Sequence, residues 1–416
     1  MLGIFQRASL VLGLTGICLS ASASQDLRID DERLPGKSIE VLEKAVTRVK
    51  FNTDLRLLRI GLAENHLLAR EVEAELDGKY RRDLEALVER EAANLIEQVY
   101  GKQFDRDVRP FLRQPQGLSS ERLRRILAAP QQGVVLDSLQ LSAEQQAEAA
   151  ALSLVAWQFP GQIERQLTLL DLYQGDNVQG QVELQQGNLR YLAEQVRQQA
   201  QRDYLWYQLG KKGFDAAEQA GLRQLVRDKL IRHKYLHQLG LHNDFHHETD
   251  SLKQRARQVS DADAEAYYRR NLPLFLNVAQ VRAAHIRLAD QATADRVHAE
   301  LQAGLAFDEA VRRYSLAEDK DQTPPGDLGL IRPQDAQLDF LRKTALLQKA
   351  DSISLPMLID GVFEIVQVRS RADKQLPLSD PSVRYEVNQA VAKEQLSREF
   401  QQRVDALLAD AKVEGL

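Results

Sequence analysis

The chain is poor in cysteine, methionine and tryptophan, and its apolar runs are short. Cysteine occurs once, at Cys18, while methionine and tryptophan each occur twice among 416 residues. A single cysteine leaves no possibility of an intramolecular disulfide. The most apolar stretch, from about Leu10 to Leu19, is shorter than the roughly 20 residues that a membrane-spanning helix requires. These absences argue against a disulfide-stapled scaffold and an integral membrane protein.

Residues 1–23 have the pattern of a secretory signal. Arg7 is their only charged residue, the apolar stretch follows it, and residues 21–23 (ASA) fit a small-x-small cleavage site. A membrane anchor is the alternative, but the stretch is too short. Cys18 does not fit a lipoprotein cysteine, because Ile17 before it is not small. We therefore predict cleavage, which removes the only thiol, and a periplasmic location for the mature chain.

The composition favours a helical protein without affinity for nucleic acid. Charged residues make up 28% of the chain and aromatic residues 6%, which is typical of helices with solvated faces. The formal net charge of −5 gives no basic footprint for nucleic acid. The length predicts two or three domains.

Residues 24–277 are predicted to form a largely α-helical region of the kind found in chaperones. Residues 25–37 are polar, and we expect them to be flexible. From Ser38 onward apolar residues recur at helical spacing. A capping-box pattern at Ser142 predicts a helix running toward Trp157, and further helices are expected, including one over 162–174.

The pattern changes at Ser260. Residues 278–288 alternate like a strand, helices and a Gly- and Pro-rich loop follow, and 362–368 form a closing strand. We predict an α+β fold overall, with a small α+β domain at 278–370 whose sheet is mostly antiparallel. Residues 380–416 are expected to form a C-terminal helix that packs on the helical region, because it carries an apolar stripe.

Several blocks of this domain resemble one family. VRAAHIRL (281–288), AFDEAVRRYSLAED (306–319), PGDLGLI (325–331) and ISLPMLIDGVFEIVQV (353–368) occur in the order seen in parvulin-type (PpiC, or rotamase) peptidyl-prolyl isomerases. The preceding segment is similar to the lead-in of SurA-, PpiD- and PrsA-like exported chaperones. The resemblance implies rotation of X-Pro bonds, which requires neither metal nor cofactor.

The resemblance also implies a site. His285 matches the first of two family histidines, and Leu328 and Phe340 match two walls of a proline pocket. An isolated histidine of this kind would more often be a core residue whose ring nitrogens are hydrogen-bonded within the protein. The blocks around His285 favour the isomerase site instead.

Three positions depart from the family pattern. Glu364 stands where the second histidine is expected, Ala317 where the family has Cys or Asp, and Ala336 in place of a pocket methionine. We expect Glu364 to take the second histidine's place in the catalytic site as the partner of His285, since a carboxylate across the strands would raise the pKa of the histidine. The chain is still predicted to be a parvulin-type isomerase, and a weak or inactive site is the alternative that these departures leave open.

Five histidines between positions 233 and 247 are the other cluster of possible ligands. A metal site needs ligands that converge, and no third ligand is placed near the helical pair His233 and His237. Solvated histidines at a helix end are the favoured interpretation, so we predict no metal.

Three functions remain open at this point. The chain is an isomerase with a chaperone region, a parvulin-like domain that binds peptide without catalysis, or an adaptor in an envelope complex. The expected partners are unfolded or proline-containing exported polypeptides, with no nucleic acid and no stable membrane insertion. The sequence leaves the oligomeric state open.

The signal assignment predicts a mature N-terminus near Ser24. Expression in a Gram-negative host followed by fractionation and N-terminal sequencing tests it, with the processed chain expected in the periplasmic fraction. An intact Met1 end recovered from membranes would contradict it.

Overall fold

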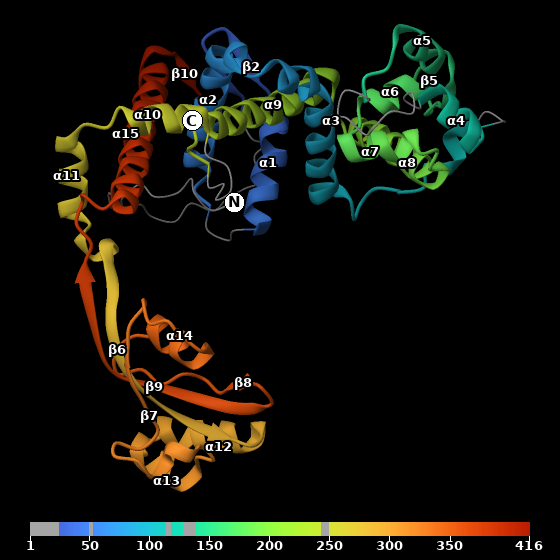
Figure 1. Cartoon of the computed structure of the whole chain (residues 1–416). Helices are drawn as coiled ribbons and strands as arrows, with labels where there is room; N and C mark the ends of the chain where they lie inside the picture. The colour runs from blue at the N-terminus through green and yellow to red at the C-terminus, as the bar shows by residue number, and fades with distance from the viewer. Residues whose placement is uncertain (1–24, 50–52, 114–117, 128–138, 243–248) are drawn as a thin grey trace, which may run out of the picture. The chain divides into compact units, whose positions relative to one another are not determined.

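The computed structural model describes residues 25–49, 53–113, 118–127, 139–242 and 249–416 (Figure 1). The chain divides into two compact units: unit 1 comprises Met1–Thr249 and Ser397–Leu416, and unit 2 comprises Asp250–Leu396. The predicted signal at 1–23 lies outside the described residues. In the part that the structure describes, no helix combines the length and apolar character needed to cross a bilayer.

Unit 1 is mainly helical, as the sequence predicts. Polar side chains cap the helix starts: the Asp77 carboxylate accepts from Tyr80 N, and Asp215 forms a capping box with Glu218. The helical elements described here are α1 (Gly36–Val49), α2 (Leu55–Val72), η1 (Glu73–Glu75), α3 (Gly78–Tyr100), η2 (Arg109–Phe111), α4 (Ser120–Leu127), α5 (Ala143–Ala151), α6 (Leu169–Gln174), α7 (Val178–Gln185), α8 (Leu189–Lys211) and α9 (Ala216–Gln238).

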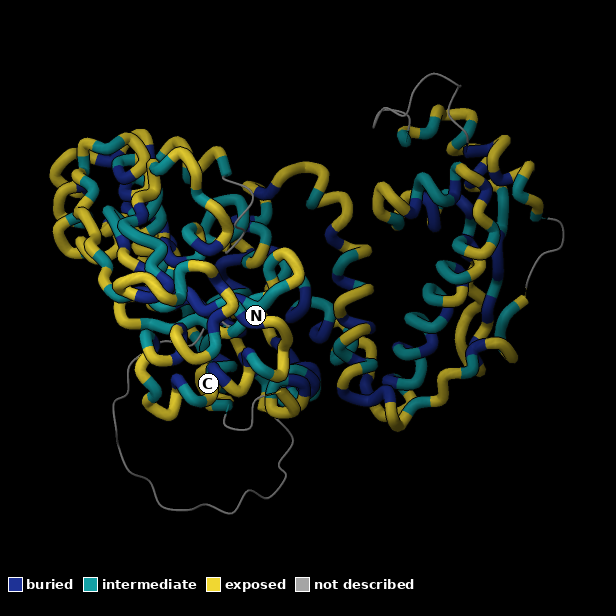
Figure 2. The backbone as a smooth tube through the Cα atoms, turned by 60° about the horizontal axis from the view of Figure 1, so that its bottom comes forward, coloured by how far each residue is buried: buried dark blue, intermediate teal, exposed yellow. Residues whose placement is uncertain are grey.

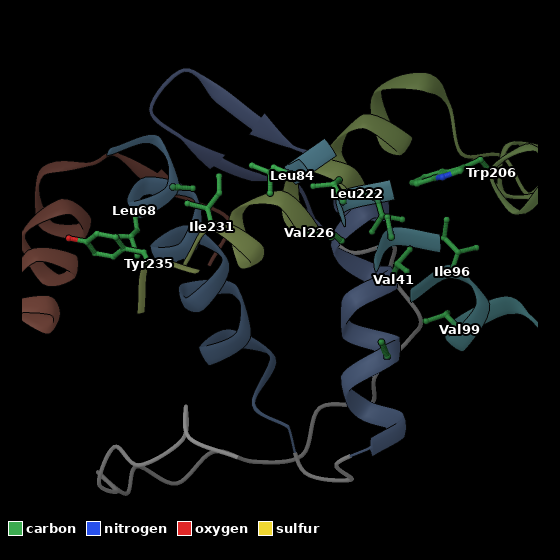
Figure 3. Close-up of a cluster of buried hydrophobic side chains, with 14 of the residues drawn as sticks. Val41, Leu68, Leu84, Ile96, Val99, Trp206, Leu222, Val226, Ile231 and Tyr235 are labelled. Atoms are coloured by element: carbon green, nitrogen blue, oxygen red, sulfur yellow. The ribbon is translucent and has the colours of Figure 1, made fainter. Parts of the chain in front are cut away.

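One large apolar cluster joins α1, α2, α3, α8 and α9. Figure 3 shows Val41, Leu84, Ile96 and Val226 among its members, all of which are buried. Buried and exposed residues alternate along the helices (Figure 2). Each helix therefore buries one stripe, which is where most of its stability originates.

A second cluster in unit 1 lies beside a sheet of order β3-β4-β5. The capping box at Ser142 is confirmed, but the helix ends at Ala151, and residues expected to be helical at 153–157 and 165–168 form strands. Val155 and Trp157 are strand-favouring residues buried against this cluster, and tertiary burial decides their conformation. The strands are β3 (Leu112–Arg113), β4 (Ser153–Trp157) and β5 (Arg165–Thr168).

Residues 25–37, which are expected to be flexible, instead contribute two strands to a sheet. β1 (Leu27–Ile29) and β2 (Glu32–Leu34) form a sheet with β10 (Val413–Glu414) in the order β10-β1-β2. Leu27 and Ile29 are fully buried. The partner strand lies near the other end of the chain, so the local sequence does not show it.

Unit 2 contains the small α+β domain, and the predicted α+β fold is confirmed. Its sheet has the order β7-β6-β9-β8, and each of these neighbours pairs antiparallel. β9 extends to Gln375, seven residues beyond the predicted end at 368, because it continues to pair with the start of β6. The elements are α10 (Asp250–Arg257), α11 (Asp261–Arg270), η4 (Leu272–Phe275), β6 (Leu276–Leu288), α12 (Gln291–Gln302), α13 (Phe307–Tyr314), η5 (Glu318–Asp321), β7 (Asp327–Ile331), α14 (Phe340–Leu347), β8 (Met357–Ile359) and β9 (Val362–Gln375).

The two faces of this sheet have different helical covers. α12 and α13 pack on one face over Ile286, Leu288 and Ile365. On the other face α14 packs over a cluster that includes Val366 and Val368. Figure 1 shows β6 and β9 running side by side through the domain. Because side chains alternate along each strand, residues on the α14 face form a separate set from the α12 face.

α15 (Pro381–Asp410) begins in unit 2 and ends in unit 1. Val383, Val387 and Val391 pack with residues of α10 and α11. In unit 1, Phe400 belongs to the large cluster of Figure 3, where its ring centroid lies 6.4 Å from that of Tyr235.

We expect Phe400→Ala to destabilise unit 1 by about 3 kcal/mol, because it leaves a cavity in a packed cluster. Denaturant unfolding of the full chain, followed by the fluorescence of Trp157 and Trp206, measures the change. Gln402→Ala on the exposed side of α15 is the matched control and should change stability by less than about 0.5 kcal/mol. Equal stabilities for the two variants would contradict the packing of this helix segment.

Candidate functional site

The site lies on the central strand pair β6 and β9. Arg287 pairs directly with Glu364, and His285 pairs with Val366. In an antiparallel ladder, opposed residues and residues two apart on one strand point to the same face. His285, Arg287 and Glu364 therefore share the face that α14 covers.

His285 and Glu364 form a buried pair. Nδ1 of His285 lies 2.8 Å from Oε2 of Glu364. His285 is 4% exposed and Glu364 1% exposed. The structure thus brings together the two residues that were predicted as the catalytic pair.

A second carboxylate contacts the other ring nitrogen. Nε2 of His285 lies 3.0 Å from Oδ2 of Asp319, which belongs to η5. An imidazolium donates from both nitrogens, whereas the neutral ring has one donor. Two carboxylates on one ring therefore favour the charged form.

Backbone hydrogen bonds place Asp319 beside the histidine. Gly326 N donates to Asp319 O at 3.1 Å, and His285 N donates to Gly326 O at 2.9 Å. Gly326 has a φ of +62°, and a Cβ there would lie 2.5 Å from the carbonyl oxygen of His285. Only glycine fits this position, so its role is to form the turn.

Ser315 ties the end of α13 to β6. Its buried hydroxyl accepts from Arg287 N and Ala317 N, each at 3.2 Å. Leu316 N donates to Arg287 O at 2.8 Å. These bonds hold the loop that carries Asp319 against the strand that carries His285.

The electrostatic balance raises the pKa of His285. Burial by itself lowers this pKa, but the hydrogen bond and charge of Glu364 and then the charge of Asp319 outweigh burial. The net pKa of the imidazole lies above its ordinary value of 6.5.

The two expected pocket residues lie in different surroundings. Leu328 on β7 is half-buried and packs on the apolar cluster beneath α14. Phe340, the first residue of α14, is 60% exposed. Ala336 is exposed and Ala317 is buried.

Three site residues were missed by the sequence interpretation. Arg287 Nε donates to Glu364 Oε1 at 2.7 Å, and Asp319 bonds the histidine two positions beyond the family's acidic position. Met357 lies directly opposite Glu364 in the β8–β9 hairpin and packs against the same apolar cluster as Leu328. The Asp-Gly turn at 360–361 is a hairpin signal that fixes this register and could have revealed Met357.

The histidine cluster brings two rings together. The centroids of His233 and His242 lie 4.4 Å apart, and burial, followed by the charge of His242, lowers the pKa of His233. His246 and His247 lie outside the described residues. Within those that are described, no group of three or more His, Cys, Asp or Glu side chains is arranged to hold a metal ion.

The sheet domain has a known class. Residues 275–370 match the rotamase family described as the PPIC-type PPIASE domain, so this segment is a parvulin-type domain. The resemblance predicted from the sequence blocks is thereby confirmed for this part of the chain.

The particular relatives are foldases. The chain is 29% identical over 172 residues to foldase protein PrsA of Geobacillus sp. (strain WCH70), covering 40% of this chain and 58% of that protein. It is 28% identical over 158 residues to foldase protein PrsA of Geobacillus kaustophilus (strain HTA426), covering 38% and 52%. The chain thus spans about half the length of the curated relatives it matches.

Two solved structures are also similar. A peptidylprolyl isomerase (PrsA) from Bacillus anthracis is 17% identical, with 50% of this chain and 80% of that chain covered and a TM-score of 0.22. A chain of the SurA-like chaperones PEB4 and Cj1289 of Campylobacter jejuni is 19% identical, with 55% and 86% covered and a TM-score of 0.22.

The raised pKa of His285 predicts a pH-dependent stability of unit 2. A raised folded pKa gives a contribution that is fully present below 6.5 and is lost as the pH rises through the folded pKa. We expect the calorimetric unfolding temperature to fall across this window. Glu364→Gln removes the largest favourable charge, so its pH dependence should be shallower. If the unfolding temperature fell equally steeply with pH in the unaltered chain and in Glu364→Gln, Glu364 would not be the cause of the raised pKa of His285.

Proposed function

We propose that this chain is a peptidyl-prolyl cis-trans isomerase and folding chaperone for exported proteins that acts without a cofactor. The observation that carries this proposal is the buried pair of His285 and Glu364 on the central strands of a PPIC-type domain. It also fits the foldase relatives.

The reaction requires no bond to break. An X-Pro amide rotates over a barrier of about 18–20 kcal/mol, and catalysis consists of binding the twisted amide better than the planar one. We assign His285 and Glu364 as the catalytic polar groups. Leu328 and Phe340 are assigned as walls for the proline ring, whose burial contributes on the order of 1.5–3 kcal/mol.

The remaining regions are assigned to client binding and export. We propose that residues 24–277, with the C-terminal helix at 380–416, form the chaperone part that holds unfolded or proline-containing polypeptides, while 278–370 form the isomerase domain. We place the chain in the periplasm after removal of residues 1–23. The signal pattern at those residues supports this location.

A second candidate is a peptide-binding domain with little turnover. It is favoured by Glu364 in place of the family's second histidine and by Asp319, which occupies Nε2 of His285. In this case the proline pocket still binds, and the chain acts as a chaperone or envelope assembly factor.

Variants of the full chain separate these candidates. His285→Ala is expected to lower proline-peptide turnover at least about tenfold, because it removes a preorganised polar group. Glu364→His is expected to raise turnover if the departure from the family limits catalysis. A protease-coupled or NMR exchange assay measures both. Normal turnover in the His285→Ala, Phe340→Ala double variant would place the site elsewhere, and no turnover in the unaltered chain selects the second candidate.

Binding is tested separately from catalysis. Phe340→Ala is expected to weaken the affinity for proline peptides by roughly tenfold, equivalent to about 1.4 kcal/mol. Leu347→Ala is the matched control, since Leu347 lies at the opposite end of α14 and is 87% exposed. Equal affinity in the two variants would remove the pocket assignment. Suppression of aggregation of an unrelated unfolded protein by the full chain tests the chaperone role.

A further inference from the structure

Glu364 creates a physical problem for the site. A carboxylate that is 1% exposed has lost its water, and such a group is costly unless charged or donor partners satisfy both oxygens. His285 satisfies only Oε2. The other oxygen needs a partner that remains charged whether or not the histidine does.

Arg287 meets this need. Its Nε donates to Oε1 at 2.7 Å, and its position in the ladder is directly opposite Glu364. The guanidinium stays charged throughout the accessible pH range. Each oxygen of the buried carboxylate thus has one cationic partner.

The backbone of Arg287 is also fixed. Its N–H donates to Ser315 Oγ, and its carbonyl oxygen accepts from Leu316 N. These two residues belong to the connection that leads to Asp319. The row Arg287, Glu364, His285 and Asp319 is therefore continuous, and it carries two cations and two carboxylates when the imidazole is charged.

We propose that Arg287 is a positioning residue of this site: it holds the Glu364 carboxylate so that its second oxygen orients the His285 ring. The proposal rests on the proposed isomerase function. Without Arg287 the Glu364 carboxylate keeps His285 as its cationic partner but can rotate. The orientation of the His285 ring is then no longer fixed.

The alternative is a surface ion pair with no role in the site. The Arg287 side chain is 42% exposed, and exposed ion pairs contribute little to stability. Such a pair affects unfolding alone. A positioning residue also changes the signals of the histidine, and that difference decides between the two.

The test uses the full chain with ¹⁵N-labelled histidine. In Arg287→Leu we expect the low-field Nδ1–H signal of His285 to broaden or vanish. The charged groups that act on His285 are Glu364 and Asp319. Those that act on Arg287 are Glu364, Asp319 and Glu318.

Arg287→Lys restores a cation and should recover most of the unaltered Nδ1–H signal. Arg282→Leu is the matched control, because it makes the same change at an exposed position of the same strand. If Arg287→Leu does not fold, Arg287→Gln replaces it, with the same expected broadening. His285 signals in the Leu or Gln variant identical to those in Arg282→Leu would overturn the proposal.

Turnover of proline peptides is the second measurement. Where the unaltered chain isomerises proline peptides, Arg287→Leu should lower kcat at least about fivefold with a smaller change in KM, and Arg287→Lys should recover much of it. Absence of turnover in the unaltered chain would refute the isomerase function alone. The NMR signals would then still decide the role of Arg287.

Discussion

The structure of the parvulin-type domain depends on how one buried carboxylate is neutralised. Glu364 sits on a central strand with almost no exposure, and His285 and Arg287 each satisfy one of its oxygens. An unpaired charge at this depth would be strongly destabilising, so the two cations and the carboxylate must be placed together. The β6–β9 ladder provides this placement, because it opposes Arg287 to Glu364 and sets His285 two residues away on the same face.

The same ladder places the purely apolar packing and the polar side chains on opposite faces of the sheet. The face under α12 and α13 is apolar, with Ile286 and Ile365 buried there. The other face carries the polar row, and beside it an apolar cluster that includes Leu328 and Met357. Under the proposed function, a proline ring needs an apolar wall and the rotating amide needs preorganised polar groups, and this one sheet face carries residues of both kinds. The proposed site differs from the two-histidine pattern that the family resemblance implies, with a carboxylate and an arginine in place of the second histidine.

Particular elements show how far the sequence could be interpreted. The capping box at Ser142 and the α+β domain follow from local patterns, and both are present. The strand at Val155 and the buried segment at Leu27 were missed, because their burial depends on partners distant in the chain. Asp319, two positions after Ala317, was not predicted as a site residue, although it contacts the histidine. A position-by-position comparison with the family cannot show a carboxylate that reaches the site from two residues further along the loop.

The sequence by itself determined the order of the parvulin blocks, the position of His285 and the glycine turn at Gly326, because these depend on residue type and short-range spacing. It also determined that Glu364 replaces a histidine. Only the tertiary structure decided what that replacement means. Arg287 opposes Glu364 through strand register, and Asp319 reaches Nε2 through a loop held by Ser315 and Gly326. Register and loop closure depend on contacts between segments far apart in the chain, which local sequence patterns do not encode.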